Sequence, residues 1–324
     1  MGLIADVRAT RDRRALTPDQ PPQRRGVLAI VLAWHQALHW WLIRVVPTPL
    51  MRHTLHLTMI RRPGNFRRPR SFNEKVNWRI LNDRRERIAA ACDKMRMKEL
   101  ARAAYPAPEL RIPQTYWFGT DLRTAPDLAG LPPWVLKPNH SSGHVVFGPS
   151  AQTDVAALVE ETDKWAQRNP VELGEWGYGQ ARPVLLIEER IPTPDGTVPA
   201  DYKFFVFDGQ VKTIQVNRGR YRYQTATFLD ADWNRLPVEW RIMPSADEPR
   251  PPELEKMLEI ARALGSGWDF VRVDLYAVDG SIWFGEYTPY PGSGLLRYTS
   301  QKFDVDMGMH WQLPTREEVR PGQP

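Results

Sequence analysis

Two segments of this chain read as β-hairpins, and they constrain its fold more than any other feature. In each, two largely apolar runs flank an Asp-Gly pair, a strong turn signal because both residues accept the positive φ angles of a two-residue turn. The first hairpin comprises residues 201–207 and 211–216, and the second comprises residues 270–278 and 281–286. A helical pattern lies between them at residues 253–264, and there is no internal repeat or heptad array. Strands mixed with helices predict an α+β or α/β domain.

The region before the hairpins predicts helices and short strands. Ser71 and Glu74 form an S-x-x-E capping box, in which the two side chains satisfy free amide groups at a helix start. Asp93 is placed to cap a second helix over residues 94–104. Further along the chain we expect strands at residues 114–118, 134–137 and 183–190, and a helix at residues 154–168.

Composition excludes several classes of protein. The 324 residues allow two globular units or one compound domain, and 42% hydrophobic with 25% charged residues exclude a wholly disordered, collagenous or multi-span membrane protein. The single cysteine, Cys92, excludes an intramolecular disulfide bond. We therefore expect a protein of a reducing compartment, which places it in the cytoplasm.

The positive charge is concentrated near the N-terminus. Residues 1–70 contain thirteen Arg, no Lys and three Asp, whereas the rest of the chain is mildly acidic. We interpret residues 1–25 as a disordered basic tail and residues 26–70 as a basic, aromatic-rich helical arm. Within this arm, residues 27–43 are shorter than the roughly 20 apolar residues that span a bilayer, and they fit either an interfacial helix or a helix packed on the body. The first interpretation implies an anionic surface at the inner face of the membrane as partner, and nucleic acid is not expected.

The first candidate ligand site is the segment WVLKPNHSSG at residues 134–143. A strand runs into Lys137 and then into a small polar loop, whose backbone amides and lysine charge suit phosphate oxygens. The spacing is neither that of a P-loop nor that of a dinucleotide-binding glycine motif. Taken alone, the loop is explained equally well as an ordinary turn.

The second hairpin carries two carboxylates, Asp274 and Glu286, and paired carboxylates near phosphates are the usual means of holding Mg²⁺. Their register decides whether they meet. A strict two-residue turn at Asp279-Gly280 places them on opposite faces of the sheet, whereas a three-residue loop makes them diagonal neighbours on one face. A shared metal ion therefore predicts the longer loop. The alternative is a plain cross-strand ion pair between Arg272 and Glu286.

A third charged pair, Asp201 and Lys203, lies on one face of the first strand of the first hairpin. A surface ion pair is the commoner explanation of such a pair when it is taken alone.

Together, these pieces resemble the ATP-grasp ligases, and specifically the family related to the teichuronic acid biosynthesis protein TupA. The segments that carry the resemblance run in family order over about 240 residues: SFNEKVNW at 71–78, CDKMRMKELA at 92–101, WVLKPNHSSG at 134–143, LLIEER at 185–190, DYKFFVFDG at 201–209, FVRVDLYAVDG at 270–280 and FGEYTPYPGSG at 284–294.

This resemblance implies a fold and a set of residue roles. ATP would lie between two α+β subdomains after a helical N-terminal region, with residues 71–133 as a helical and linker part, 134–190 as the first subdomain, 191–312 as the second and 313–324 as a tail. The residues implied to bind the nucleotide are Lys94, Lys137, Ser141, Ser142, Gly143, Glu188 and Glu189. Lys203 and Arg272 would be catalytic at the terminal phosphates, Asp274 and Glu286 would hold Mg²⁺, and the residues near the substrate would be His140, Arg297 and Tyr298. Thr288 stands where many ATP-grasp enzymes have Asn, which leaves the number of metal ions open.

The resemblance also implies an activity. ATP-grasp enzymes typically convert a carboxylate to an acylphosphate, which an amine then attacks with release of ADP and phosphate. In this family we expect a role in bacterial cell-surface polysaccharide synthesis, with an amino acid or another amine joined to a small-molecule or glycan substrate of the uronic acid type. A kinase acting on a hydroxyl group, a glycosyltransferase and a non-catalytic membrane-associated module are the alternatives.

Overall fold

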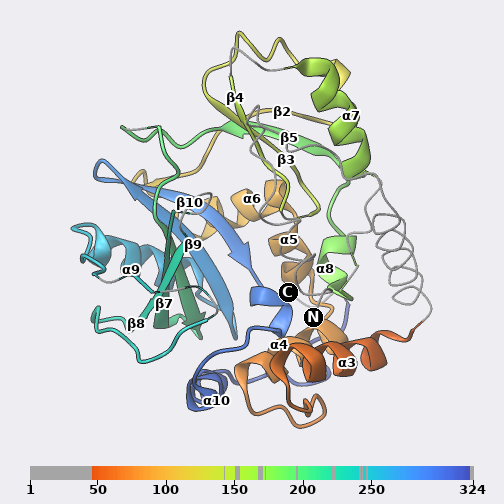
Figure 1. The fold of residues 1–324 in the computed structure, drawn as a ribbon, viewed down its shortest axis with the longest axis vertical. Coiled ribbons are helices and arrows are strands. Elements are labelled where there is room, and N and C mark those ends of the chain that lie inside the picture. Colours follow the sequence, from red (N-terminus) through yellow and green to blue (C-terminus); the bar gives the residue numbers. More distant parts are fainter. Residues whose placement is uncertain are drawn as a thin grey trace, which may run out of the picture.

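The computed structural model describes residues 46–321 apart from residues 142, 150–153, 167–170, 172, 195, 220–223, 241, 243 and 246. Two β-sheets and the helices around them make up this part of the chain (Figure 1), which confirms the predicted α+β class. Among the helices of these residues, none is both long enough and apolar enough to traverse a bilayer. The predictions for residues 1–25 and 27–43 fall outside the described residues.

The larger sheet has six strands in the order β1-β10-β9-β6-β7-β8, with β1 and β10 parallel and the other neighbours antiparallel. Both predicted hairpins are confirmed, and each turns through an Asp-Gly pair in which both residues have positive φ. The strands are β1 (Leu110–Arg111), β6 (Asp201–Phe207), β7 (Gln210–Arg218), β8 (Thr225–Leu229), β9 (Val271–Val278) and β10 (Ser281–Thr288).

The smaller sheet has four antiparallel strands in the order β2-β5-β3-β4. They are β2 (Thr115–Gly119), β3 (Trp134–Pro138), β4 (Val146–Gly148) and β5 (Leu185–Glu189). On one face, Trp134 and Ile187 pack with residues of the helix α7 (Val155–Ala166) and the 3₁₀ turn η1 (Leu122–Thr124). Side chains alternate along a strand, so Lys137 and Glu188 point to the opposite face.

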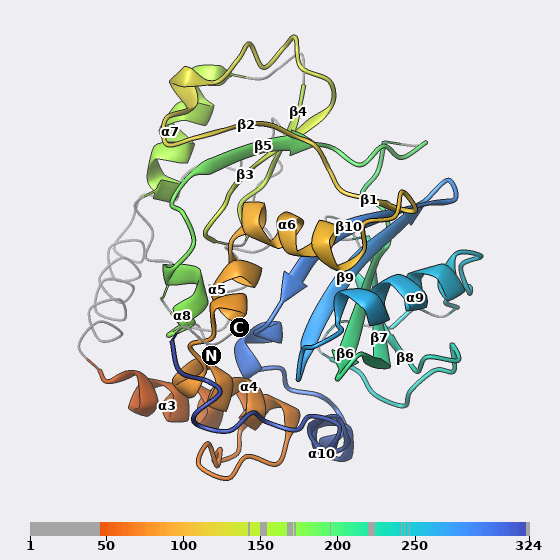
Figure 2. The ribbon, with the colours of Figure 1, turned by 180° about the vertical axis from the view of Figure 1, so that it is seen from behind.

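Helices enclose the larger sheet and separate it from the smaller one. Helix α9 (Leu254–Leu264) covers one face, where Gly265 permits a close approach because a Cβ atom there would lie 2.4 Å from Cγ1 of Val206. On the other face, Phe72 of α4 (Phe72–Asn82) packs edge-on against Phe205 and Phe270. Helices α5 (Glu86–Cys92) and α6 (Lys94–Ala104) lie between the two sheets (Figure 2). The remaining elements are α8 (Trp176–Gly179), the 3₁₀ turn η2 (Pro291–Gly294) and α10 (Gln301–Met309).

Local capping signals correctly predict where two helices begin. At α4 the Ser71 hydroxyl accepts from the amide of Glu74, and the Glu74 carboxylate accepts from the amide of Ser71, so the capping box is complete. At α6 the Asp93 carboxylate accepts from the amides of Met95 and Arg96.

Helix α3 (Thr48–Ile60), which belongs to the predicted arm, packs on the body of the protein. Its Arg52 side chain is fully buried and donates from Nε to Oδ1 of Asn77 at 2.8 Å and from Nη1 to Oγ of Ser293 at 3.0 Å. Burial lowers the pKa of Arg52 to about 10, with Glu175 acting in the opposite sense. Arg52 thereby ties α3 to both α4 and η2.

Candidate functional site

A cluster of charged side chains lies on one face of the larger sheet, where β6, β9 and β10 run side by side. Lys203 pairs with Asp274 in the register of β6 and β9, and its Nζ lies 2.5 Å from Oδ2 of Asp274 and 2.5 Å from Oδ2 of Asp201. All three side chains are buried, so the commoner explanation of Asp201 and Lys203 as a surface ion pair is wrong. Two acidic groups around one buried lysine favour a preorganised polar site over a solvated pair.

Arg272 completes this cluster by contacting both candidate metal ligands. Its Nε and Nη2 each lie 2.7 Å from a carboxylate oxygen of Asp274, and Nη2 also donates to Oε1 of Glu286 at 3.1 Å and to Oγ1 of Thr288 at 3.0 Å. Burial opposes the charged form, yet Asp274 and then Glu286 raise the pKa of Arg272 above its ordinary value. The guanidinium group therefore stays charged while it holds the two carboxylates.

A β-bulge brings the two carboxylates onto one face of the hairpin. From Ser281 to Phe284 the strands follow the register of a two-residue turn, and the register then shifts at Gly285 so that Glu286 stands directly opposite Asp274. The expectation that a shared site requires a three-residue loop is therefore wrong. A bulge adds one residue to one strand, so the side chains beyond it point to the other face of the sheet. The residues of the turn do not predict such a bulge.

Gly285 is required at this bulge for steric reasons. A Cβ atom there would lie 2.9 Å from the carbonyl oxygen of Asp274 and 2.9 Å from Cε2 of Tyr276, and the first of these is backbone that cannot turn away. We expect Gly285→Ala to lower the free energy of unfolding by about 1–3 kcal/mol and to weaken ligand binding at the Asp274 and Glu286 carboxylates. Urea denaturation measures the first effect. Gly130→Ala is the matched control, because the nearest atoms to its new Cβ lie at 3.5 and 3.7 Å, and an equal loss in both variants would contradict this role.

A second charged group lies on the smaller sheet, on the face opposite to α7. Glu188 of β5 is buried between two ammonium groups: Lys137 contacts its Oε1, and Nζ of Lys98 lies 2.7 Å from its Oε2. Although burial opposes the ionised form, Lys137 and then Lys98 hold the pKa of Glu188 below its usual range. Glu189, the next residue, points to the other face, where its carboxylate accepts from the amide of Gln114.

Lys94, at the start of α6, lies between the two charged groups. Its Nζ donates to the carbonyl of Pro138, the last residue of β3, at 2.8 Å and to that of Ser141 in the following loop at 2.5 Å. Burial first, and Lys137 next, lower the pKa of Lys94 to about 8, while Glu286 and Glu188 act to raise it. Lys94 is therefore within electrostatic reach of a carboxylate from each sheet.

The loop after β3 presents further predicted residues beside Lys94. His140 is buried, and neither of its ring nitrogens has a hydrogen-bond partner in the described part of the chain. Burial, assisted by the charge of Lys94, lowers the pKa of His140, which keeps the ring neutral at pH 7. Gly143 has a φ of 89°. Ser142 falls outside the described residues.

Three polar residues near these groups were not predicted from the sequence. Lys98 follows Lys94 by four residues and therefore lies on the same side of α6, a spacing that would have indicated it. Gln215 and Asn217 are buried on β7, and the Gln215 amide donates to Oδ1 of Asn217 at 2.9 Å. In the structure they are paired in register with Lys203 and Asp201. In the sequence they alternate with apolar residues, and this alternation would have indicated that they lie on one face of a strand.

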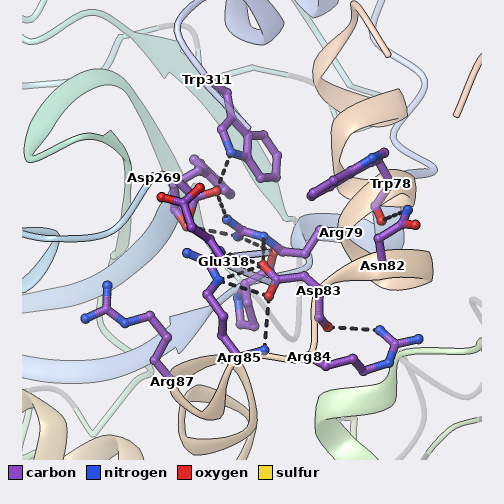
Figure 3. Close-up of polar contacts among 12 residues, drawn as sticks. Trp78, Arg79, Asn82, Asp83, Arg84, Arg85, Arg87, Asp269, Trp311 and Glu318 are labelled. Carbon is purple, nitrogen blue, oxygen red and sulfur yellow. Dashed lines mark hydrogen bonds and ion pairs between the residues drawn. The ribbon is translucent and has the colours of Figure 1, made fainter. Parts of the chain in front are cut away.

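A buried polar network centred on Arg79 of α4 includes Asp83, Asp269 and Trp311 (Figure 3). Arg79 donates from Nη1 to the carbonyl of Phe270, just before β9, and to that of Pro289, just after β10. Its Nη2 lies 2.6 Å from Oδ2 of Asp269, which also accepts from Trp311 and Arg85. The strands that carry Arg272, Asp274 and Glu286 are thereby fixed to the helical part of the protein.

The predicted substrate residues Arg297 and Tyr298 lie in the segment that follows η2. Arg297 is exposed, whereas Tyr298 is 9% exposed and packs edge-on against Phe228 and Phe303. Both residues line a cavity beside α10.

Comparison with known proteins gives one family match. A family model described as TupA-like ATPgrasp matches residues 74–312. None of the curated proteins matches this chain.

Several solved structures are similar to this one. The D-alanine–D-alanine ligase from Bacillus anthracis complexed with ATP is 17% identical with a TM-score of 0.39, and the similarity covers 70% of this chain and 66% of the ligase. The corresponding ligase from Helicobacter pylori is 15% identical with a TM-score of 0.39, covering 69% of this chain and 61% of that one. The ATP-grasp ligase PsnB complexed with a minimal precursor is 15% identical with a TM-score of 0.34, covering 63% and 54%. This chain thus spans less than two thirds of the length of each of these ligases.

Proposed function

Because this chain belongs to the TupA-like ATP-grasp family, whose model matches residues 74–312, we propose that it is an ATP-dependent carboxylate–amine ligase. Family membership confirms the resemblance drawn from the sequence motifs and the ATP-grasp fold that it implied. The observation that carries the proposed activity is the position of Lys94, which lies within electrostatic reach of Lys137 and Glu188 on the smaller sheet and of Glu286 on the larger one. Glu286 in turn stands directly opposite Asp274.

The cations are placed for a polyphosphate. Lys137 on the smaller sheet, Lys94 on α6, and Lys203 with Arg272 on the larger sheet would each contact part of the ATP phosphate chain. In this structure the same cations are engaged by Glu188, Asp201, Asp274, Glu286 and backbone carbonyls. Phosphate oxygens would replace these partners, so the site already holds the charges that ATP requires.

The donor set at the hairpin fits Mg²⁺. Magnesium is held in nucleotide sites by one or two carboxylates together with phosphate oxygens, which is what Asp274 and Glu286 offer when ATP is bound. In the described part of the chain, no group of three or more His, Cys, Asp or Glu side chains forms a metal site by itself, which agrees with a metal bound only together with nucleotide. Bound Mg²⁺ would neutralise charge on the transferred phosphoryl group.

The proposed reaction has two steps. A carboxylate oxygen of the substrate attacks the γ-phosphorus of ATP, and the bond between that phosphorus and the oxygen of the β-phosphate breaks. The products of this step are ADP and an acylphosphate. An amine then attacks the acyl carbon, loses a proton and expels phosphate, so that an amide forms. Arg272 and Lys203 stabilise the negative charge on the transferred phosphoryl group in the first step.

We further propose that the substrate carboxylate belongs to a uronic acid or a related acidic glycan of the bacterial cell surface and that the reaction takes place in the cytoplasm. This part of the proposal rests on the family assignment. Contact of residues 26–70 with an anionic membrane is likewise a proposal that rests on their sequence.

The test is Mg-ATP binding by isothermal titration calorimetry. We expect the wild-type protein to bind, Lys137→Ala to weaken binding about tenfold or more, and Asp274→Asn to make the affinity independent of Mg²⁺. Lys256→Ala on the exposed side of α9 is the control and should bind as the wild type does. Failure of the folded wild-type protein to bind Mg-ATP would overturn the proposed activity.

ATP binding should also change the protonation of Lys94. With a pKa of about 8, Lys94 is half charged at pH 8 without ligand, and phosphate groups favour the charged form, so binding takes up a proton. We expect an uptake of about 0.5 proton at pH 8 that fades toward pH 6, measured by calorimetry in buffers of different ionisation enthalpy. In Lys94→Arg, whose charge does not titrate in this range, the uptake should vanish. An unchanged uptake in that variant would assign the proton to another group.

A further inference from the structure

A polar cavity of about 640 Å³ lies among three segments that are distant in the sequence, and its lining includes none of the cations assigned above to ATP. Residues 60–62 at the end of α3 line it together with residues 296–301, and Glu239 and Ile242 form a further side. The amide of Thr299 donates to the carbonyl of Glu239, and the amide of Glu239 donates to the hydroxyl of Thr299, each at 2.9 Å, which holds the last two segments together. Two walls of the cavity are therefore fixed relative to each other.

The cavity is lined by three arginines, Arg61, Arg62 and Arg297, that are exposed and have no hydrogen bond or ion pair from their guanidinium groups within the described residues. Arg61 has a φ of 63° and forms the left-handed cap at which α3 ends. One of the two acidic residues in the lining, Asp304, is buried and accepts from the amide and side chain of Asn73. The arginines thus leave a net positive lining.

Tyr298 connects this cavity to the catalytic cluster. It lines the cavity, is more than nine-tenths buried, and has no hydrogen-bond partner for its hydroxyl group in the part of the chain that the structure describes. Its ring packs edge-on against Phe228, which is paired with Gln215 on β7, and Gln215 is paired in turn with Lys203 on β6. Residues paired in register lie on the same face of a sheet, so Tyr298 lies over the face that carries Lys203 and Asp274. A ligand in the cavity would therefore lie over the same face of the larger sheet as the proposed phosphoryl-transfer site.

Size and charge select the class of ligand. The volume is in the range of about 300–1,000 Å³ that holds whole ligands, and it exceeds what a single amino acid needs. Three guanidinium groups without partners among the described residues match a ligand with more than one anionic group, and the hydroxyl and amide side chains of Thr299, Ser300 and Gln301 suit a ring with several hydroxyl groups.

We propose that this cavity binds the acidic substrate of the ligase as an oligosaccharide with several carboxylates, which Arg61, Arg62 and Arg297 recognise while one carboxylate extends toward Arg272. The proposal rests on the ligase function proposed above. It assigns part of the N-terminal basic segment to substrate binding.

The test uses tri-galacturonic acid as the probe and the full-length protein. Calorimetric titrations are made at low salt, with and without Mg²⁺ and a non-hydrolysable ATP analogue. We expect the wild-type protein to bind the trisaccharide and Arg62→Gln/Arg297→Gln to bind it about tenfold or more weakly, with unchanged affinity for the nucleotide analogue. Added salt should weaken binding, since the recognition is ionic.

Two controls separate this proposal from its alternatives. Arg316→Gln removes an exposed arginine outside the cavity and should leave trisaccharide binding unchanged, and neutral maltotriose should not bind. The proposal is overturned if the wild-type protein does not bind the trisaccharide, if the double variant and Arg316→Gln bind it equally, or if pyrophosphate displaces it and binds more tightly. Absence of nucleotide binding, by contrast, would overturn the proposed ligase function. The trisaccharide titration made without nucleotide would still show whether the cavity binds the acidic oligosaccharide.

Discussion

Exchange of Arg272 for Lys should slow the release of ADP by about 10³-fold, while the affinity for Mg-ATP changes by less than about tenfold. The exchange keeps the positive charge but replaces a planar fork by a single ammonium group. In the structure that fork bonds both oxygens of Asp274 and reaches Glu286 and Thr288, which one ammonium group on a flexible stem does not reproduce. The loss should therefore fall on the turnover number, because charge placement matters most in the transition state.

This prediction is measured by ADP release in a coupled assay with Mg-ATP and an acidic oligosaccharide plus an amine, or with water as the slow acceptor. Arg111→Lys is the matched control: Arg111 lies on the edge strand of the same sheet, stacked over Trp283, and its exchange should leave turnover unchanged. Turnover within threefold of the wild-type value in Arg272→Lys would remove Arg272 from the catalytic groups.

Removal of the charge of Arg79 should produce the largest loss of stability. Arg79 is fully buried, pairs with Asp269 at 2.6 Å, and lies with its guanidinium carbon 4.3 Å from the ring centroid of Trp311. We expect Arg79→Met to lower the free energy of unfolding by about 3–5 kcal/mol, because one partner of a buried ion pair is removed while the other stays. The carbonyls of Phe270 and Pro289 would also lose their donor, which frees both ends of the hairpin formed by β9 and β10.

Urea denaturation followed by circular dichroism measures this effect. Arg84→Met is the control, because the side chain of Arg84 is only part-buried. It donates to the backbone carbonyls of Ile80, Leu81 and Asp83, which lie close to it in the sequence. Its cost should stay below about 1.5 kcal/mol. Similar losses in the two variants would show that the Arg79 network adds nothing beyond ordinary hydrogen bonds. Figure 3 shows both arginines in relation to Asp83 and Asp269.

Local sequence patterns were sufficient for the two hairpin turns and for the starts of two helices. The Asp-Gly turns, the capping box at Ser71 and the cap at Asp93 act within a few residues, so their physics can be read from neighbouring letters, and all of them occur as expected. The ATP-grasp resemblance followed from the order of such segments, and the family match confirms it.

Tertiary packing decided how the charged residues meet. The facing of Glu286 depends on whether Gly285 forms a bulge, and that depends on the approach of the neighbouring strand β9. Two ion pairs join residues that are far apart in the chain: Arg79 with Asp269, and Lys98 of α6 with Glu188 of β5. Each pair meets only when the helices pack on the sheets. Burial likewise turned Asp201 and Lys203 into a core pair, because solvent exposure is a property of the folded chain and local charge patterns do not report it.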